Sequence, residues 1–218
     1  MQYTMMTGNR IENGCSGNTG RSTLAELVMR NHFEDLGISD YVIASSGVSV
    51  NTPHSSEPRT PSKRIIQLGL EGDVYSPSER KAIENALHAE KAEELLIYHD
   101  KAIDTFKARE VAHRDEAIKY FNIRGSIKTV PEQTIVRPEL AIFFAMDNKA
   151  RDAFRIIYAE AQGARVEFLG GYALGDDTTE IPNAFGMSKD FYFNMASDVL
   201  KYAKFAADRF IREKKSVE

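Results

Sequence analysis

Residues 15–22 read CSGNTGRS, and the helix-forming stretch TLAE follows them directly. The five residues between Cys15 and Arg21 can form a tight loop whose backbone N–H groups converge on one point. The helix behind the loop adds its positive N-terminal end, and Gly17 and Gly20 allow the left-handed or crowded backbone that such a loop needs. This stretch therefore predicts a binding site for a tetrahedral oxyanion.

The same stretch contains the residue types of a nucleophilic site. Arg21 can close the far side of the loop with a planar, two-pronged contact to phosphate. The positive surroundings favour the nucleophilic thiolate form of Cys15, and Ser22 can donate a hydrogen bond to the sulfur. A lone cysteine is more often a small buried hydrophobic residue. The Gly-Asn interior, the serine after the arginine and the helix behind the loop together favour a functional loop.

Four segments, in this order, resemble the low-molecular-weight protein tyrosine phosphatase family. They are CSGNTGRS with the following TLAE, SSGVS at 45–49, FFAMD at 143–147 and IPNAFGMSKDF at 181–191. The resemblance implies an α/β fold of the phosphatase I type, in which helices cover both faces of a small parallel four-stranded sheet. We expect the phosphate loop at the carboxyl end of the first strand. Residues 1–50 and 113–218 are expected to form this core, and residues 51–112 a helical insertion.

The resemblance also implies a role for individual residues. Cys15 is the expected nucleophile, Ser22 supports its thiolate, and the hydroxyl of Ser45 supports Asn18. Phe185 is expected either to form an aromatic wall for the substrate or to anchor its loop in the core. The expected phosphate-binding residues are Ser16, Gly17, Asn18, Thr19, Gly20 and Arg21.

Two departures from the family pattern affect the chemistry. Asn183 occupies the position of the general acid, an aspartate in the family, and an amide cannot deliver a proton to a leaving group. Other carboxylates nearby are candidate substitutes, although a solvated position is the more frequent role of each: Asp176, Asp177, Glu180 and Asp190. Gly20 stands where many members have a second cysteine. With one cysteine in the chain, an internal disulfide and self-contained arsenate reduction are both excluded.

Local patterns predict the elements of the first half of the chain. The first helix is expected to be capped by Ser22 or Thr23 and to end before Gly37. Residues 41–46 predict a short buried strand. Residues 10–14 look too polar for a central parallel strand, so either this strand is short or Met5 and Met6 supply its apolar part. Further helices are predicted at 61–69, after the capping box at 76–79, and on both sides of a break near His99-Asp100.

The second half predicts two strands, at 140–146 and 165–169, and two helices, at 152–160 and after Ser188. The apolar positions of the insertion predict a helical face that packs on the core or on a second copy of the chain, so a homodimer through the insertion is one expectation. A lid or wall beside the substrate is another.

Composition narrows the classes of function. The net charge is −4 and the pI about 5.8, which argues against a general nucleic-acid binder. The sequence contains no apolar run near the ~20 residues of a membrane span, and the segment MQYTMMTGNR has no secretory signal pattern. A cytoplasmic location is therefore expected. The histidines show no metal-site spacing, and neither a metal nor a cofactor is expected.

The loop 15–22 and the resemblance to the phosphatase family together predict hydrolysis of phosphomonoesters, foremost phosphotyrosine, through a cysteinyl-phosphate intermediate. The expected partners are a phosphorylated protein or a small aryl phosphate, with inorganic phosphate as product or inhibitor. The alternative is a module that binds phosphate or a phosphopeptide and has lost efficient turnover, which Asn183 favours. Arsenate reduction with an external thiol is a more remote alternative.

Overall fold

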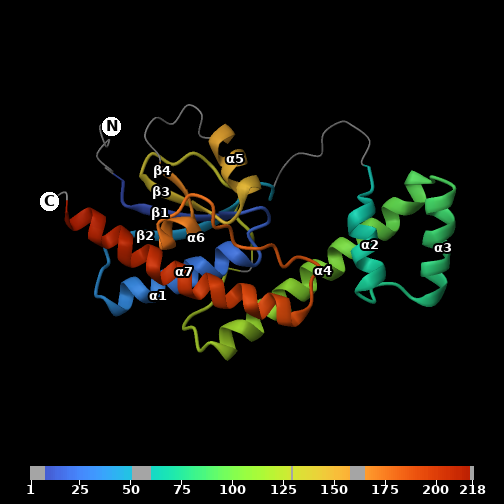
Figure 1. Ribbon diagram of the computed structural model, residues 1–218, viewed down its shortest axis with the longest axis horizontal. Helices are drawn as coiled ribbons and strands as arrows, with labels where there is room; N and C mark the ends of the chain where they lie inside the picture. Colours follow the sequence, from blue (N-terminus) through green and yellow to red (C-terminus); the bar gives the residue numbers. More distant parts are fainter. Residues whose placement is uncertain (1–7, 51–59, 129, 158–164, 217–218) are drawn as a thin grey trace. The chain divides into compact units, whose positions relative to one another are not determined.

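The computed structural model of the protein describes residues 8–50, 60–128, 130–157 and 165–216 (Figure 1). The chain forms two compact units. The core unit comprises Met1–Thr52, Glu116–Asn183 and Asn194–Glu218, and the helical unit comprises Pro53–Asp115 and Ala184–Phe193. The helical unit thus includes residues 184–193, which the sequence analysis assigned to the core.

The core unit is built on four parallel strands in the order β2-β1-β3-β4. Their bounds are β1 Arg10–Cys15, β2 Val42–Gly47, β3 Leu140–Ala145 and β4 Arg165–Phe168. Helix α1 (Arg21–Asp35) and the later part of α7 (Lys189–Lys215) cover one face of the sheet, and α5 (Asn148–Ile157) covers the other (Figure 1). The short helix α6 (Leu169–Leu174) follows β4 directly. The predicted fold class is confirmed.

Strand β1 is central although its sequence is polar, so the doubt about residues 10–14 was wrong. All six residues of β1 are buried. Glu12 is only 1% exposed, and its burial is stabilised by two hydrogen bonds: Arg10 donates to one carboxylate oxygen at 2.9 Å, and the Ser46 hydroxyl donates to the other. Paired charges can be buried in this way when each polar atom has a partner. Met5 and Met6 lie outside the described residues.

The first helix begins earlier than its capping pattern predicts. Gly20 is the N-cap and no side chain caps the helix, because the hydroxyls of the two predicted caps are used elsewhere. The Ser22 hydroxyl contacts Asn18 and the sulfur of Cys15, and the Thr23 hydroxyl donates to the Gly20 carbonyl. The predicted end is confirmed: the helix stops at Asp35, and Gly37 has a φ of +69°.

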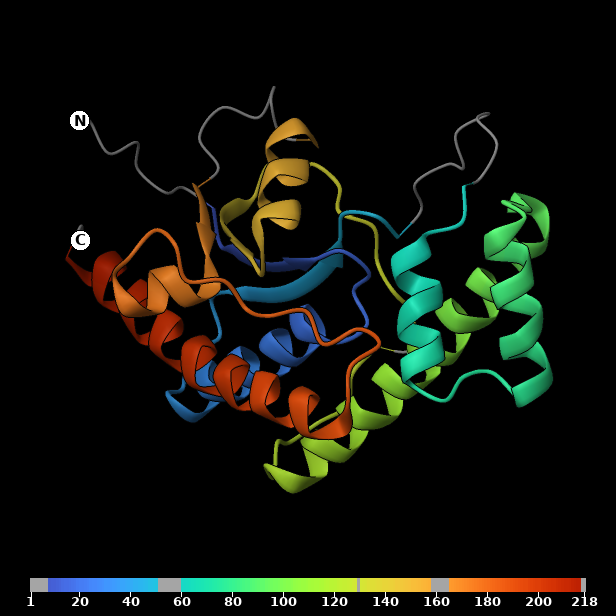
Figure 2. The ribbon, with the colours of Figure 1, turned by 45° about the vertical axis from the view of Figure 1, so that its right-hand side comes forward.

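The helical unit contains α2 (Lys63–Glu71), α3 (Pro77–His88) and most of α4 (Ala92–Tyr120) (Figure 2). The capping box of Ser76 and Glu79 is confirmed. The predicted break near His99-Asp100 is wrong, because α4 runs through it without interruption. The chain breaks instead at Glu90, whose φ of 51° places a residue other than glycine in the left-handed region.

The apolar positions of the helical unit face one another. Phe106, which is fully buried, lies at the centre of this packing. The rings of Phe106 and Phe185 meet edge to face, with centroids 5.7 Å apart. This contact explains why residues 184–193 group with the helical unit. The other buried members of the cluster are Ile66, Tyr75, Ile83, Ala86, Leu95 and Ala102.

The remaining bounds differ little from the predictions. Helix α5 begins at Asn148, four residues before the predicted start at 152, and residues 158–160 of the predicted helix lie outside the described part of the chain. Helix α7 begins after Ser188, whose hydroxyl accepts from the Phe191 N–H at 3.3 Å, so the predicted cap is confirmed.

Substitution of Gly14 tests the packing that brings β1 against β3. A Cβ atom at Gly14 would lie 1.8 Å from Cζ of Phe143, whose fully buried ring stacks on Phe154 and has no room to move. We expect Gly14→Ala to lower the free energy of unfolding by about 1–3 kcal/mol, measured by urea denaturation. Gly17→Ala is the matched control, since its Cβ would meet only the Thr19 hydroxyl at 3.5 Å. Equal midpoints for the two variants would contradict the prediction.

Candidate active site

The loop 15–22 begins where β1 ends and lies against the turn that follows β2. The Val48 N–H donates to the carbonyl of Cys15, and the Ser49 N–H donates to the carbonyl of Ser16, both at 3.0 Å. A Cβ atom on Gly47 would lie 2.9 Å from both the Asn18 nitrogen and the Ser16 carbonyl oxygen. The loop can approach this closely only because residue 47 is a glycine.

Asn18 shapes the interior of the loop. Its φ of 51° is left-handed, a conformation that asparagine tolerates better than most residues. This turn directs the Asn18 N–H at the sulfur of Cys15, 3.2 Å away. The side-chain Nδ2 donates to the Ser45 carbonyl at 3.5 Å, and Oδ1 accepts from the Ser22 hydroxyl at 3.0 Å. Asn18 is 3% exposed, so these contacts are shielded from water.

Ser22 lies between the cysteine and Asn18. Its oxygen is 3.0 Å from the sulfur of Cys15 and 3.0 Å from Oδ1 of Asn18. A hydroxyl has one hydrogen, so Ser22 donates to one of these two atoms at a time. With a thiol, the S–H donates to Ser22 and Ser22 donates to Asn18. With a thiolate, the hydroxyl hydrogen turns to the sulfur and joins the Asn18 N–H there.

Ser45 lies beside Asn18 as expected, but its hydroxyl does a different job, so that part of the prediction was wrong. The Ser45 hydroxyl donates to Oε2 of Glu26 at 2.5 Å, and its carbonyl, not its hydroxyl, contacts Asn18. Glu26 is 5% exposed and is also paired with Arg30 at 2.5 Å. A buried carboxylate needs such hydrogen-bond donors. The Ser45 hydroxyl can serve Glu26 because the side-chain amide of Asn18 donates to the Ser45 carbonyl instead.

Arg21 is buried at the start of α1 and already has two partners. Its Nη1 donates to Oδ2 of Asp147 at 2.7 Å and to the Ile181 carbonyl at 2.9 Å. The other oxygen of Asp147 accepts from the Ala150 N–H at 2.8 Å, at the start of α5. Sequence reasoning gave Asp147 no role. The available signal was its position directly after the buried strand predicted at 140–146.

The loop that precedes Asn183 is hydrogen-bonded to Arg21 and to the end of β3. The Ile181 N–H donates to the Met146 carbonyl at 2.7 Å, while the Ile181 carbonyl accepts from Arg21. The structure thus brings together the end of β3, the arginine of the loop and the segment that ends at Asn183. Asn183 itself is exposed.

Two of the carboxylates predicted as possible substitutes for an acid at position 183 have structural partners. Asp176 accepts hydrogen bonds from the backbone of Thr178 and from the hydroxyl and backbone of Thr179, which lower its pKa to about 2. It is therefore ionised at neutral pH and has no proton to give. Glu180 accepts from the backbone and the side chain of Asn148 at the start of α5. Asp177 is exposed on the same loop.

Two predicted positions fall in the helical unit. Phe185 packs edge to face on Phe106, as a core anchor would, so its role as a substrate wall stays a prediction. Asp190 is exposed in the first turn of α7, where a carboxylate interacts favourably with the helix dipole.

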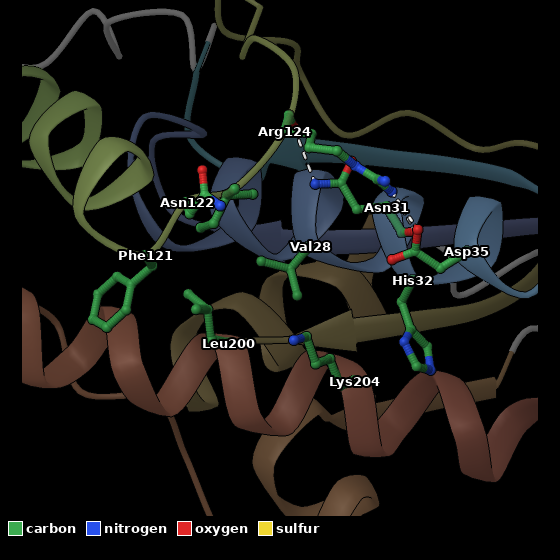
Figure 3. Close-up of a pocket in the computed structure, with 10 residues that line it drawn as sticks. Val28, Asn31, His32, Asp35, Phe121, Asn122, Arg124, Leu200 and Lys204 are labelled. Atoms are coloured by element: carbon green, nitrogen blue, oxygen red, sulfur yellow. Dashed lines mark hydrogen bonds and ion pairs between the residues drawn. The ribbon is translucent and has the colours of Figure 1, made fainter.

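A cleft of about 280 Å³ lies elsewhere in the core unit (Figure 3). Val28 and Leu200 contribute apolar side chains from α1 and α7, and Lys204 projects into the space between these helices. Arg124 pairs with Asp35 at the rim, at 2.6 Å. The cleft begins about two turns along α1 from Arg21, so it does not contain the cysteine loop.

Within the described residues, no three His, Cys, Asp or Glu side chains gather in a way that could hold a metal ion. In the same part of the chain, no helix is both long and apolar enough to cross a bilayer.

The sequence matches no family model and no curated protein. The structure, in contrast, superimposes on solved structures with TM-scores of 0.56. A YwlE mutant from Bacillus subtilis aligns at 16% identity over 93% of this chain and 98% of that chain. A low-molecular-weight phosphotyrosine phosphatase from Vibrio cholerae O395 aligns at 14% identity over 95% and 99%. A Drosophila arginine phosphatase aligns at 15% identity over 96% and 99%.

The chain has the low-molecular-weight phosphatase fold. These similarities extend over nearly all of each solved chain, so the likeness concerns the whole architecture. In this fold Cys15, Asn18, Arg21 and Ser22 lie at the carboxyl end of β1, where open α/β sheets bind their ligands.

Alkylation of Cys15 tests the oxyanion site. If the loop stabilises a thiolate and binds phosphate over it, iodoacetate should modify Cys15 rapidly at pH 6, and inorganic phosphate should protect it. Arg21→Ala should lose the protection, whereas Arg155→Ala, an exposed arginine on α5, should keep it. Mass spectrometry measures both. Alkylation that starts only above pH 8, or phosphate protection that survives in Arg21→Ala, would contradict this site.

Proposed function

We propose that the protein hydrolyses phosphomonoesters, with phosphotyrosine the first substrate to test, through a cysteinyl-phosphate intermediate. The observation that carries the proposal is the environment of the Cys15 sulfur. The Asn18 N–H points at it from 3.2 Å and the Ser22 hydroxyl lies 3.0 Å away, at the positive end of α1 beside Arg21. These groups are what a thiolate nucleophile and a phosphoryl group need in the same place.

The steps follow from the loop. The Cys15 thiolate attacks phosphorus, the bond to the leaving oxygen breaks, and the phosphoryl group remains on sulfur. The loop amides and Arg21 stabilise the equatorial oxygens. Arg21 can do so while its Nη1 keeps Asp147 and Ile181, since a guanidinium has five N–H donors. Water then attacks the cysteinyl-phosphate, and Ser22 stabilises the thiolate as it departs.

The fold alone does not distinguish between phosphorylated side chains as substrates. The superimposed structures include phosphotyrosine and arginine phosphatases by their descriptions, so both phosphotyrosine and phosphoarginine belong in the first assay. A nucleophilic thiolate is preserved in a reducing compartment, which is consistent with a cytoplasmic location.

The second candidate is a module that binds phosphate or a phosphopeptide without efficient turnover. The observation that favours it is Asn183, combined with the structural roles of Asp176 and Glu180. General acid–base help is worth about 10²–10⁴-fold in rate, so its loss can turn an enzyme into a binder.

The Cys15→Ser variant separates these functions. We expect the parent protein to hydrolyse p-nitrophenyl phosphate, and Cys15→Ser to lose turnover while it still binds vanadate or phosphate in calorimetry. Ser216→Ala, a substitution at the exposed residue that follows α7, is the control for the preparation and folding of the variant. Binding without turnover of any substrate would favour the binding module. Turnover that persists in Cys15→Ser would contradict the proposed enzyme.

Restoring an acid at position 183 tests the missing proton donor. We expect Asn183→Asp to raise kcat for phosphotyrosine by roughly 10- to 1000-fold, because an acid at that position would protonate the phenolate oxygen as it leaves. In the parent, an activated aryl phosphate, which needs little protonation, should still phosphorylate Cys15. The cysteinyl-phosphate should then accumulate and give a burst of the activated phenol, since the same residue would activate water in the second step. A parent that hydrolyses phosphotyrosine briskly, with no gain in Asn183→Asp, would show that another carboxylate is the acid.

A further inference from the structure

Two carboxylates of the core unit that could replace the missing acid, Asp147 and Glu180, are held in other contacts. Asp147 keeps one oxygen on Arg21 at 2.7 Å and the other on the Ala150 N–H at 2.8 Å. Glu180 keeps both oxygens on Asn148. Among the described residues of the loop 176–183, Asp177 is the carboxylate left exposed to water.

Asp147 is paired with the loop arginine, and both of its oxygens are engaged, one by Arg21 and one by the Ala150 N–H. This geometry suits it to orient Arg21. The phosphate loop has the groups to bind a phosphoryl group and attack it, whereas Asp147, Asp176 and Glu180 are engaged in other contacts.

The need for a proton depends on the leaving group. A tyrosine phenol has a pKa of about 10 and a protein carboxylic acid one of about 4. A phenolate must gain a proton as the P–O bond breaks or leave as a strong base in neutral water. A carboxylate leaves as a weak base that stays ionised at pH 7, so the reaction needs no acid.

We propose that the preferred substrates of this site are acyl phosphates, the mixed anhydrides of a carboxylic acid and phosphoric acid. This inference rests on the proposed phosphatase activity and names its substrate class. It follows from the combination of a complete nucleophile loop, Asn183 at the acid position, and Asp147, Asp176 and Glu180 held by other groups.

The reaction balances without a protein acid. The thiolate of Cys15 forms a bond to phosphorus, and the bond between phosphorus and the acyl oxygen breaks. The carboxylate leaves with the electron pair. In the second step water attacks the cysteinyl-phosphate, the S–P bond breaks, and the thiolate returns. Both hydrogens of the water remain on the product, dihydrogen phosphate, so the sum is acyl phosphate plus water giving carboxylate plus dihydrogen phosphate.

Benzoyl phosphate and phenyl phosphate are a matched pair for the test, because they differ by one carbonyl between the ring and the bridging oxygen. We expect kcat/KM for benzoyl phosphate, corrected for spontaneous hydrolysis, to exceed that for phenyl phosphate by at least about 100-fold. In Asn183→Asp this ratio should fall at least tenfold, because an acid assists mainly the phenolate. Asp177→Asn should leave the ratio as in the parent.

A second measurement does not depend on any variant. Across a series of substituted phenyl phosphates, log kcat/KM of the parent should fall steeply as the pKa of the phenol rises. A flat plot would overturn the inference, because it indicates that a group on the enzyme protonates the leaving oxygen. So would similar rates for benzoyl and phenyl phosphate, or a loss of phenyl phosphate hydrolysis in Asp177→Asn.

Two further arms separate the sources of an acyl phosphate. Acetyl phosphate represents small molecules, and an aspartyl phosphate formed on a purified receiver domain represents proteins. Faster Cys15-dependent hydrolysis of either one supports the inference and assigns its source. If neither acyl nor aryl phosphates are hydrolysed in a way that Cys15→Ser abolishes, the proposed function itself fails. If aryl phosphates are hydrolysed and acyl phosphates are not, only the present inference fails.

Discussion

The hydrogen bond from the Asn18 N–H to the sulfur of Cys15 requires a backbone conformation that most residues adopt only at a cost. The surrounding structure holds Asn18 in this conformation. The Ser22 hydroxyl and the Ser45 carbonyl hold its side chain, and Gly47 leaves room for its backbone nitrogen. The contacts that strands β1 and β2 make at their carboxyl ends thus decide whether several N–H groups can point at one anion.

Much of this local arrangement could be predicted from the sequence because it depends on neighbouring residues. The loop 15–22 contains its glycines, its arginine and the start of its helix within one short stretch. Gly37 and the capping box at Ser76 are signals of the same kind. The break at Glu90 was missed because the left-handed residue there is a glutamate, and no glycine or proline marks it.

The rest of the candidate site depends on residues far apart in the chain. Arg21 is paired with Asp147 and Ile181, and these partners are known only once β3 lies beside β1. The role of Ser45 was predicted for the wrong atom because Glu26, on the facing helix, takes its hydroxyl. Phe185 was assigned to the core unit but belongs to the helical unit, because its ring packs on Phe106, a residue far away in the sequence.

The buried pair of Arg10 and Glu12 has a consequence for alignment of the strands. In a sheet, a slip of one residue turns every side chain to the opposite face. Such a slip of β1 would turn both Arg10 and Glu12 toward α1 and take Glu12 away from the Ser46 hydroxyl, and a buried polar atom left without its partner costs about 1–3 kcal/mol. The correct alignment places Cys15 opposite Gly47 and Gly14 opposite Ala145. Glu12, a charged residue in the middle of the sheet, therefore helps to fix the position of the Cys15 sulfur at the end of β1.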